Sequence, residues 1–243
     1  MDENLTKLAY LHLRQKIRAG TMSPGSKLVN RALAKEIGVG ISPVRAALYQ
    51  LIKEGYLDHQ PGLGVFIPVE NRRELEEIYE FREVLEITAI EKCCGKMREK
   101  SLSEMARYID VQASILDVFL SKGEEGVCED DFHQWSKADA DFHSVPLYCL
   151  RNRKMSKILE AMWTRIQTVY FRLIDWPHGI LQQRTIDEHR QILEALRTGD
   201  KETAKAVLTK NIQIGLNGIL EAYDRKGGEV RETQPFWTES RGA

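Results

Sequence analysis

The sequence predicts a mostly helical protein in two parts, a small N-terminal domain over residues 1–68 and an antiparallel all-helical bundle over residues 74–225. Three observations support this division. Two short amphipathic helices joined by a tight turn occupy residues 33–55, and two strand-like runs follow them. Beyond residue 74 the strand signals disappear, and helical periodicity continues almost to the end.

The N-terminal domain opens with an expected amphipathic helix over residues 8–17, followed by a turn at residues 23–26. Asn30 is a suitable N-cap for the next helix, because its side chain can accept a hydrogen bond from a free backbone N–H. Gly38 stands where that helix needs a left-handed C-terminal residue. These signals place a short helix between two defined ends.

A second helix follows after a tight turn. Ser42 can cap it, and Pro43 then takes the first helical position, where a missing N–H has no consequence. The apolar stripe of this helix faces inward, and the opposite face carries Arg45. Gly55 ends the helix. Taken alone, the pair could be a helix-turn-helix or a helical hairpin in an ordinary core.

The flanking residues favour the first alternative. Residues 56–59 and 65–68 are typical of short strands, and a Pro-Gly-Leu-Gly turn lies between them. A helix-turn-helix closed by such a β-ribbon is a winged helix. Its second helix enters the major groove of DNA, and the wing can reach the backbone or the minor groove.

Charge separates the two parts. Residues 1–68 contain nine Lys and Arg against five Asp and Glu, a net charge of +4, whereas the whole chain has −1 and the remainder therefore −5. A basic head on an acidic body suits a phosphate partner for the head alone.

Composition excludes several other classes. No run approaches the ~20 apolar residues of a membrane helix, and the start Met-Asp-Glu lacks the basic and apolar regions of a signal peptide. We expect a cytoplasmic protein with no membrane partner. The four cysteines lack metal-finger spacing and are expected to be reduced thiols.

Six helices with short connections are expected in the second part, which makes an antiparallel bundle whose facing helices can build a central ligand or metal site. Residues 69–73 are expected to link it to the head, and residues 226–243 to form a mobile tail. The expected helices cover residues 74–90, 102–120, 128–150, 155–174, 179–196 and 201–223.

Four side chains of the bundle form a candidate metal site. Asp139 and His143 are four residues apart, so one helix points both to the same side. His189 and Asn211 lie about equally far from the turn between the last two helices, and therefore at similar depth. Imidazole with carboxylate suits zinc, nickel, manganese or iron. The alternative is a set of surface residues and satisfied core residues.

The head resembles the DNA-binding domain of GntR-family bacterial transcription regulators. The resemblance rests on about sixty residues in one register, including Gly20-Thr-Met-Ser-Pro-Gly-Ser-Lys-Leu28, Pro43-Val-Arg45, Glu54-Gly55 and Gly62-Leu-Gly64. It implies that Arg31 and Arg45 touch DNA and that Gly62, Leu63 and Gly64 form the wing tip. Ile41, Ser42 and Pro43 are further DNA-binding candidates, because the N-terminal residues of the second helix face the bases.

One stretch departs from this family. Its recognition turn usually reads Val-Ser-Arg-Thr-Pro-Val-Arg, and here it reads Val39-Gly-Ile-Ser-Pro-Val-Arg45. Arg is the commonest reader of guanine, whereas Ile41 can make only apolar contacts, for instance with a thymine methyl group. The operator is expected to differ from the family norm, or specificity to be relaxed.

The second part is similar to the helical effector domain of the FadR-type subgroup, called FCD, through Asp139-Ala-Asp-Phe-His143 and Glu188-His-Arg-Gln-Ile-Leu193. Many members hold a divalent metal with one Asp and three His and bind a small carboxylate beside it. Asp139, His143 and His189 match three ligands, and Asn211 replaces the fourth. Arg82 matches the opening helix and is expected to bind the carboxylate, the alternative being a salt bridge to Glu86.

These features favour a ligand-responsive transcription regulator, expected to be a repressor that binds a palindromic operator as a homodimer. We expect no enzyme activity, because no carboxylate is well aimed beside His189 to act as a general base. The alternatives are a metal-dependent enzyme acting on small carboxylates, a metal-free regulator with a larger ligand, and a bundle that serves only dimerisation.

Overall fold

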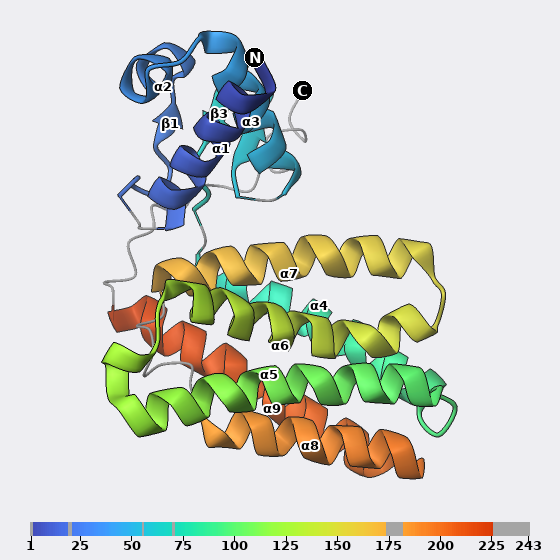
Figure 1. The fold of residues 1–243 in the computed structure, drawn as a ribbon. Coiled ribbons are helices and arrows are strands. Elements are labelled where there is room, and N and C mark those ends of the chain that lie inside the picture. Colours follow the sequence, from blue (N-terminus) through green and yellow to red (C-terminus); the bar gives the residue numbers. More distant parts are fainter. Residues whose placement is uncertain (1, 19–20, 55, 70, 174–181, 226–243) are drawn as a thin grey trace, which may run out of the picture.

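The computed structural model describes residues 2–18, 21–54, 56–69, 71–173 and 182–225. It has the two expected parts, a small head above a bundle of long helices (Figure 1). The expected mobile tail, residues 226–243, lies outside the described residues. None of the described helices combines the length and the apolar character needed to cross a membrane.

The head contains three helices and a small antiparallel sheet in which β3 is the central strand. The first helix packs mainly against the third, and buried apolar side chains from both form one core with the sheet. The elements are α1 (Asp2–Arg18), β1 (Lys27–Leu28), α2 (Asn30–Ile37), α3 (Ile41–Lys53), β2 (Asp58–Gln60) and β3 (Gly64–Phe66).

The capping predictions in the head are wrong in two places. Asn30 is the first residue of α2, Val29 precedes it, and no side chain caps the helix. Helix α3 likewise begins at Ile41 after Gly40, so Ser42 is not its cap. Gly38 has φ 76° at the C-terminus of α2, as predicted. With Gly40 extended, a turn of only three residues separates the helices.

The proline and the wing are also shifted from their predicted positions. Pro43 occupies the third position of α3, which is still within the first turn, where backbone N–H groups have no helical partner. The wing strands lie at 58–60 and 64–66, because Tyr56 and Leu57 are buried in the head core. The short strand β1 was not predicted. Helix α3 ends at Lys53, and Gly55 lies outside the described residues.

The bundle consists of six long helices, in the predicted order, with a short 3₁₀ turn at Gly123–Gly126. Asn71 and Glu74 form a capping box at the start of the first of them, which thus begins within the stretch expected to be a linker. The helices are α4 (Arg72–Cys93), α5 (Glu99–Lys122), α6 (Glu129–Cys149), α7 (Arg153–Leu173), α8 (Gln183–Thr198) and α9 (Lys201–Arg225).

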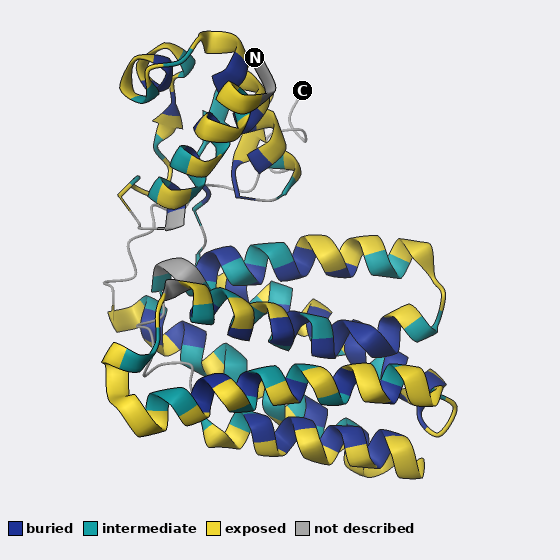
Figure 2. Cartoon of the chain, in the orientation of Figure 1, coloured by how far each residue is buried: buried dark blue, intermediate teal, exposed yellow. Residues whose placement is uncertain are grey.

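Each helix of the bundle turns its buried face inward (Figure 2). Helix α4 packs along α9, and α5 packs along both α6 and α8. This arrangement brings α6 and α8, which carry the predicted metal ligands, into the same interior. Helix α8 begins at Gln183 rather than 179; residues 179–181 lie outside the described residues.

Candidate DNA-binding surface and effector site

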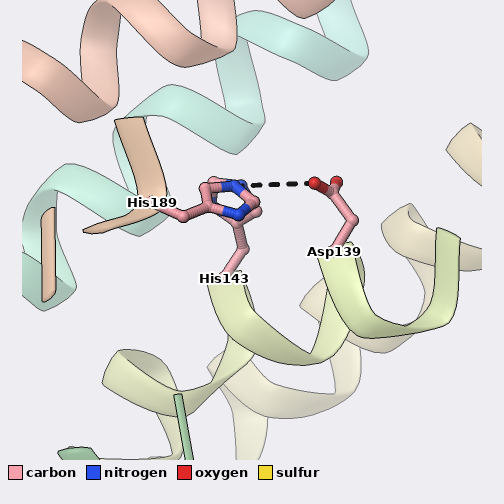
Figure 3. A group of neighbouring side chains, drawn as sticks. All are labelled: Asp139, His143 and His189. Atoms are coloured by element: carbon pink, nitrogen blue, oxygen red, sulfur yellow. Dashed lines mark hydrogen bonds and ion pairs between the residues drawn. The ribbon is translucent and has the colours of Figure 1, made fainter. Parts of the chain in front are cut away.

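Three of the four predicted metal ligands lie together inside the bundle. Asp139 and His143 project from α6, and His189 reaches them from α8 (Figure 3). The two Nε2 atoms of the histidines are 3.2 Å apart, and His189 Nε2 is 3.6 Å from Asp139 Oδ1. Both imidazoles are buried, and Asp139 is half-buried. The three side chains that the sequence spacing placed together thus lie close enough to share one ion.

The other ring nitrogen of each histidine has a fixed acceptor. His143 Nδ1–H donates to Glu86 Oε2 at 2.8 Å, and His189 Nδ1–H donates to Gln112 Oε1 at 2.9 Å. The amide of Gln112 also donates through Nε2 to Asp139 Oδ1 at 3.4 Å. When both rings are neutral, these bonds place the proton of each ring on Nδ1, and the lone pairs of both Nε2 atoms then face the centre of the cluster.

A cation satisfies this convergence of lone pairs. Burial lowers the pKa of the His189 imidazole well below its usual range, and the neighbouring His143 and Arg82 side chains lower it further, so His189 stays neutral. Ligand atoms on a tetrahedral ion with bonds of about 2.0–2.1 Å lie about 3.3–3.4 Å apart. The separations of 3.2 and 3.6 Å agree with that spacing. The residues present thus fit a divalent metal.

A cavity of about 130 Å³ adjoins this cluster. Arg82, Asp139 and Asn211 all lie in its wall, with Trp163 and Tyr170 among the aromatic residues that complete it. The predicted effector residue and the predicted fourth ligand therefore face the same space as one of the metal ligands. This is the arrangement expected for a ligand bound beside a metal.

Arg82 has the salt bridge that was its alternative interpretation. Its Nε donates to Glu86 Oε1 at 2.8 Å, and both side chains are buried. The guanidinium carbon lies 4.2 Å from the centre of the Trp163 ring, which adds a cation–π contact. Glu86 accepts from His143 as well, so one buried carboxylate holds both a metal-site histidine and the arginine.

Asn211 is turned toward Glu188. Its Nδ2 donates to Glu188 Oε2 at 2.9 Å, and because a carboxylate only accepts, this bond fixes which end of the amide is nitrogen. Glu188 is buried and also lies 3.7 Å from the Lys210 ammonium. Among the described residues no hydrogen bond joins Asn211 to the three clustered ligands.

The sequence analysis missed Gln112 in this site, and it considered Glu86 only as a partner of Arg82. Gln112 and Glu86 are both buried, at positions that continue the apolar stripes of their helices. A polar side chain within an apolar stripe is the sequence signal that could have identified them, because a buried polar group requires a partner. The partners themselves are far away in the chain and could not be read from spacing.

The proposed DNA-reading residues of α3 divide into two sets. Ile41, which is 40% exposed, Ser42 and Arg45 lie on the surface of the helix. Pro43 is buried, so its side chain packs inward and shapes the first turn of the helix. Among the described residues Arg45 makes no ion pair, which leaves its guanidinium available to a base or a phosphate.

The remaining DNA-binding candidates are exposed as well. Arg31 lies on the surface of α2. Leu63 is 59% exposed at the tip of the wing, between Gly62 and Gly64, whose φ angles of 77° and 122° suit glycine. The sequence interpretation missed Tyr49, which is 60% exposed on α3 and stacks beneath the Lys53 ammonium at 4.8 Å.

A winged-helix head joined to a helical bundle with a cavity at a buried histidine cluster defines the class of ligand-responsive DNA-binding regulators. Two family models match the chain: bacterial regulatory proteins of the gntR family over residues 5–67, and the FCD domain over residues 77–213. The chain belongs to the GntR family of bacterial regulators, in the FadR-type subgroup that carries an FCD domain.

Similar proteins are transcription regulators. The HTH-type transcriptional regulator McbR of Escherichia coli K12 is 23% identical over 213 residues, covering 88% of this chain and 91% of McbR. The uncharacterized HTH-type regulator YdhC of Bacillus subtilis is 28% identical over 196 residues, 81% of this chain and 82% of YdhC. The prediction of a regulator and not an enzyme is confirmed by these relatives and families.

Solved structures agree in fold. The E. coli McbR/YncC structure has a TM-score of 0.62 at 22% identity and covers 91% of this chain and 98% of that one. Lar of Listeria monocytogenes has a TM-score of 0.66 at 19% identity, covering 89% and 96%. The FCD family is known for metal binding, which agrees with a possible Asp and His site in this chain.

Proposed function

We propose that this regulator is a repressor whose homodimer binds a palindromic operator, and that a small carboxylate bound beside a divalent metal controls it. The observation that carries the effector part is the cluster of Asp139, His143 and His189, whose two Nε2 lone pairs converge on one point. A head that binds phosphate and a bundle that binds a ligand are the two halves such a switch requires.

Asp139, His143 and His189 would hold the metal. Two imidazoles and one carboxylate suit zinc, nickel, manganese or iron, and three protein ligands leave positions open for another donor. When bound, the ion supplies a positive charge that attracts the effector's carboxylate. Asn211 replaces the usual fourth histidine. Its amide nitrogen is bonded to Glu188, so Asn211 would serve either as part of the cavity wall or by offering its amide oxygen to the metal.

Arg82 is the second partner for the carboxylate. Its Nε is committed to Glu86, which leaves the two terminal nitrogens of the guanidinium for a bidentate interaction. Because Glu86 also accepts from His143, the arginine and the metal site share one support. An effector that contacts both would reach the centre of the bundle.

In the head, we propose that Arg31, Ile41, Ser42 and Arg45 contact the operator, with Gly62, Leu63 and Gly64 forming the wing tip that touches the backbone or minor groove. The DNA-binding domain is taken as residues 1–68 and the effector and dimerisation domain as residues 74–225. A two-fold dimer presents two heads, and the operator is then palindromic.

Effector binding can change repression only if the effector binds two arrangements of the heads with different affinities. The effector cavity and the head are joined through α7, which carries Trp163 in the cavity wall and Arg165, 3.5 Å from Asp58 in the wing. This connection supports control through the placement of the heads.

The deciding experiment measures the metal content of protein purified without chelator, together with a mobility shift on DNA from upstream of its own gene. We expect about one divalent ion per chain in the wild type and none in His189→Ala, with His12→Ala in the head as the matched histidine control. A sequence-preferring shift supports the operator. If no metal is found and His189→Ala changes nothing, the metal-free regulator with a larger ligand is correct.

A further inference from the structure

Helix α9 contains two glycines in its interior, Gly215 and Gly218, and both lie in the wall of the effector cavity. Glycine is the least favourable helix residue after proline, because it loses the most backbone freedom on folding. Two of them within one turn weaken the helix. Their presence therefore calls for a local reason.

The backbone does not supply that reason. Neither glycine has a positive φ, so both have conformations open to any residue. A Cβ added at Gly215 would lie 3.4 Å from Tyr79 Cε1 and 3.5 Å from the Tyr170 hydroxyl, which is ordinary contact. A Cβ added at Gly218 would have no atom within 4 Å. Close packing therefore does not require glycine at position 218 either.

The space next to Gly218 belongs to the cavity. Asn211, Ile214 and Gly218 are spaced by three, four and seven residues, so they share one face of α9, and all three line the cavity. A cavity of about 150 Å³ accepts benzene, which has six non-hydrogen atoms, so a volume of about 130 Å³ holds roughly five or six such atoms. An acid of about that size would fill the cavity, whereas acetate, with four non-hydrogen atoms, would leave part of it empty.

We propose that Gly218 is a specificity-determining residue. Its missing side chain makes room for the distal part of the effector, whose carboxylate lies at the Arg82 and Asp139 end. The cavity therefore selects carboxylates of medium length over the smallest ones. The inference rests on the proposed function, because it takes the cavity to be the effector site, and it adds the size of the acid that the site accepts.

The test compares Gly218→Ala and Gly218→Leu with the wild type by thermal unfolding, in a series of acids from acetate through propionate and lactate to succinate. Without acid, Gly218→Ala is expected to unfold about 2–4 °C higher, since alanine favours the helix and fills empty space. We expect Gly218→Leu to weaken protection by the larger acids at least tenfold while leaving any effect of acetate unchanged. Asn217→Leu, on the exposed neighbouring position, is the matched control and should behave as the wild type toward every acid.

Two results overturn the proposal: the larger acids protect Gly218→Leu as well as the wild type, or no acid longer than acetate protects the wild type. Titration with zinc or manganese alone separates this failure from failure of the metal site. Position 218 is outside the ligand cluster, so both Gly218 variants should bind the ion as the wild type does. Loss of metal binding in all proteins would contradict the proposed metal, and the acid series would still decide the role of Gly218.

Discussion

At the scale of single residues, Gln112 connects the parts of the metal site. Its side chain is completely buried, accepts from His189 through Oε1 and donates to Asp139 through Nε2. A single amide thus fixes the tautomer of one ligand and the position of another. Groups that orient metal ligands in this way contribute strongly to metal affinity, although they do not touch the ion.

Replacing this amide tests its role. Gln112→Met keeps the length and volume of the side chain and removes both hydrogen bonds. We expect metal affinity to fall 10- to 100-fold, measured by calorimetric titration of chelator-treated protein with zinc. Asp110→Ala on the exposed side of the same helix is the control and should bind as the wild type. Unchanged affinity in Gln112→Met would mean that the histidine is oriented without Gln112.

Ile41 is the second residue whose change is informative. It is an exposed apolar side chain in the first turn of α3, where the family usually has arginine. Ile41→Arg restores a group that can bind guanine O6 and N7, and each such contact discriminates between bases by about 1–3 kcal/mol.

Selection of binding sites from random DNA checks this expectation. The Ile41→Arg protein should prefer guanine at a half-site position where the wild type prefers thymine or has no preference. Ile41→Leu, which keeps an apolar side chain, should select the wild-type sequence. Identical selected sites for Ile41→Arg and the wild type would show that this side chain does not face a base.

At the scale of helices and strands, the sequence predicted which elements exist more accurately than where each one begins and ends. All six bundle helices and the helix-turn-helix follow from apolar periodicity, because a buried face must repeat every 3.6 residues. The starts of α2 and α3 were wrong because Asn30 and Ser42 have the chemistry of caps, whereas backbone geometry selected Val29 and Gly40. Strand β1 consists of only two residues, which is too short to show alternation.

The metal site shows a second limit, which concerns contacts between residues far apart in the chain. Asp139, His143 and His189 could be placed together because helix geometry relates residues four apart and residues across a turn. Gln112 meets His189 across 77 positions of the chain, and Glu86 meets His143 across 57. Pairing at such separations depends on how the helices pack, and a single sequence carries no direct signal for it.

The exposed face of α3 leads to a prediction about the whole recognition helix. Arg45→Ala should weaken operator binding by about 1–3 kcal/mol if Arg45 contacts a base, and the loss should be confined to the operator. If Arg45 contacts a phosphate, binding should weaken equally on all sequences. The slope of the logarithm of the binding constant against the logarithm of the salt concentration should then become smaller by about one.

Lys53→Ala provides the comparison from the other end of the helix. Lys53 lies over the Tyr49 ring near the C-terminus of α3, away from the end expected to enter the groove. Fluorescence anisotropy with operator and with unrelated DNA at several salt concentrations measures both variants. A larger loss in Lys53→Ala than in Arg45→Ala would reverse the proposed orientation of the helix in the groove.

At the scale of the whole molecule, the head and the bundle meet at α7. The head lies above α7 (Figure 1), and α1 contacts α7. The guanidinium of Arg165 on α7 lies 3.5 Å from the Asp58 carboxylate of the wing. A second cavity of about 350 Å³ lies between Arg14 and Tyr56 of the head and the helices α6 and α7. Trp163 lines this cavity and the effector cavity, and it stacks on His143. A single helix therefore touches the metal site and the head.

This junction can be tested by a double-mutant cycle of Asp58→Asn and Arg165→Gln. Asp58 is half exposed, so the ion pair is worth at most about 1 kcal/mol of folding stability. Its loss should nevertheless free the head to change its orientation and so alter DNA affinity. Either substitution alone also changes the net charge of the protein and can alter DNA affinity in that way. The cycle removes this effect, because it isolates the interaction energy between the two residues.

We expect a coupling energy of about 0.2–1 kcal/mol in operator affinity, measured by anisotropy, and a different coupling energy in metal-loaded and metal-free protein. The difference follows if the metal site, through Trp163 and α7, sets the position from which Arg165 meets the wing. The metal content of all four proteins should be the same, because neither residue touches the cluster. Strict additivity in both metal states would mean that the contact between Asp58 and Arg165 does not place the head, and control by the effector would then have to pass through another part of the junction.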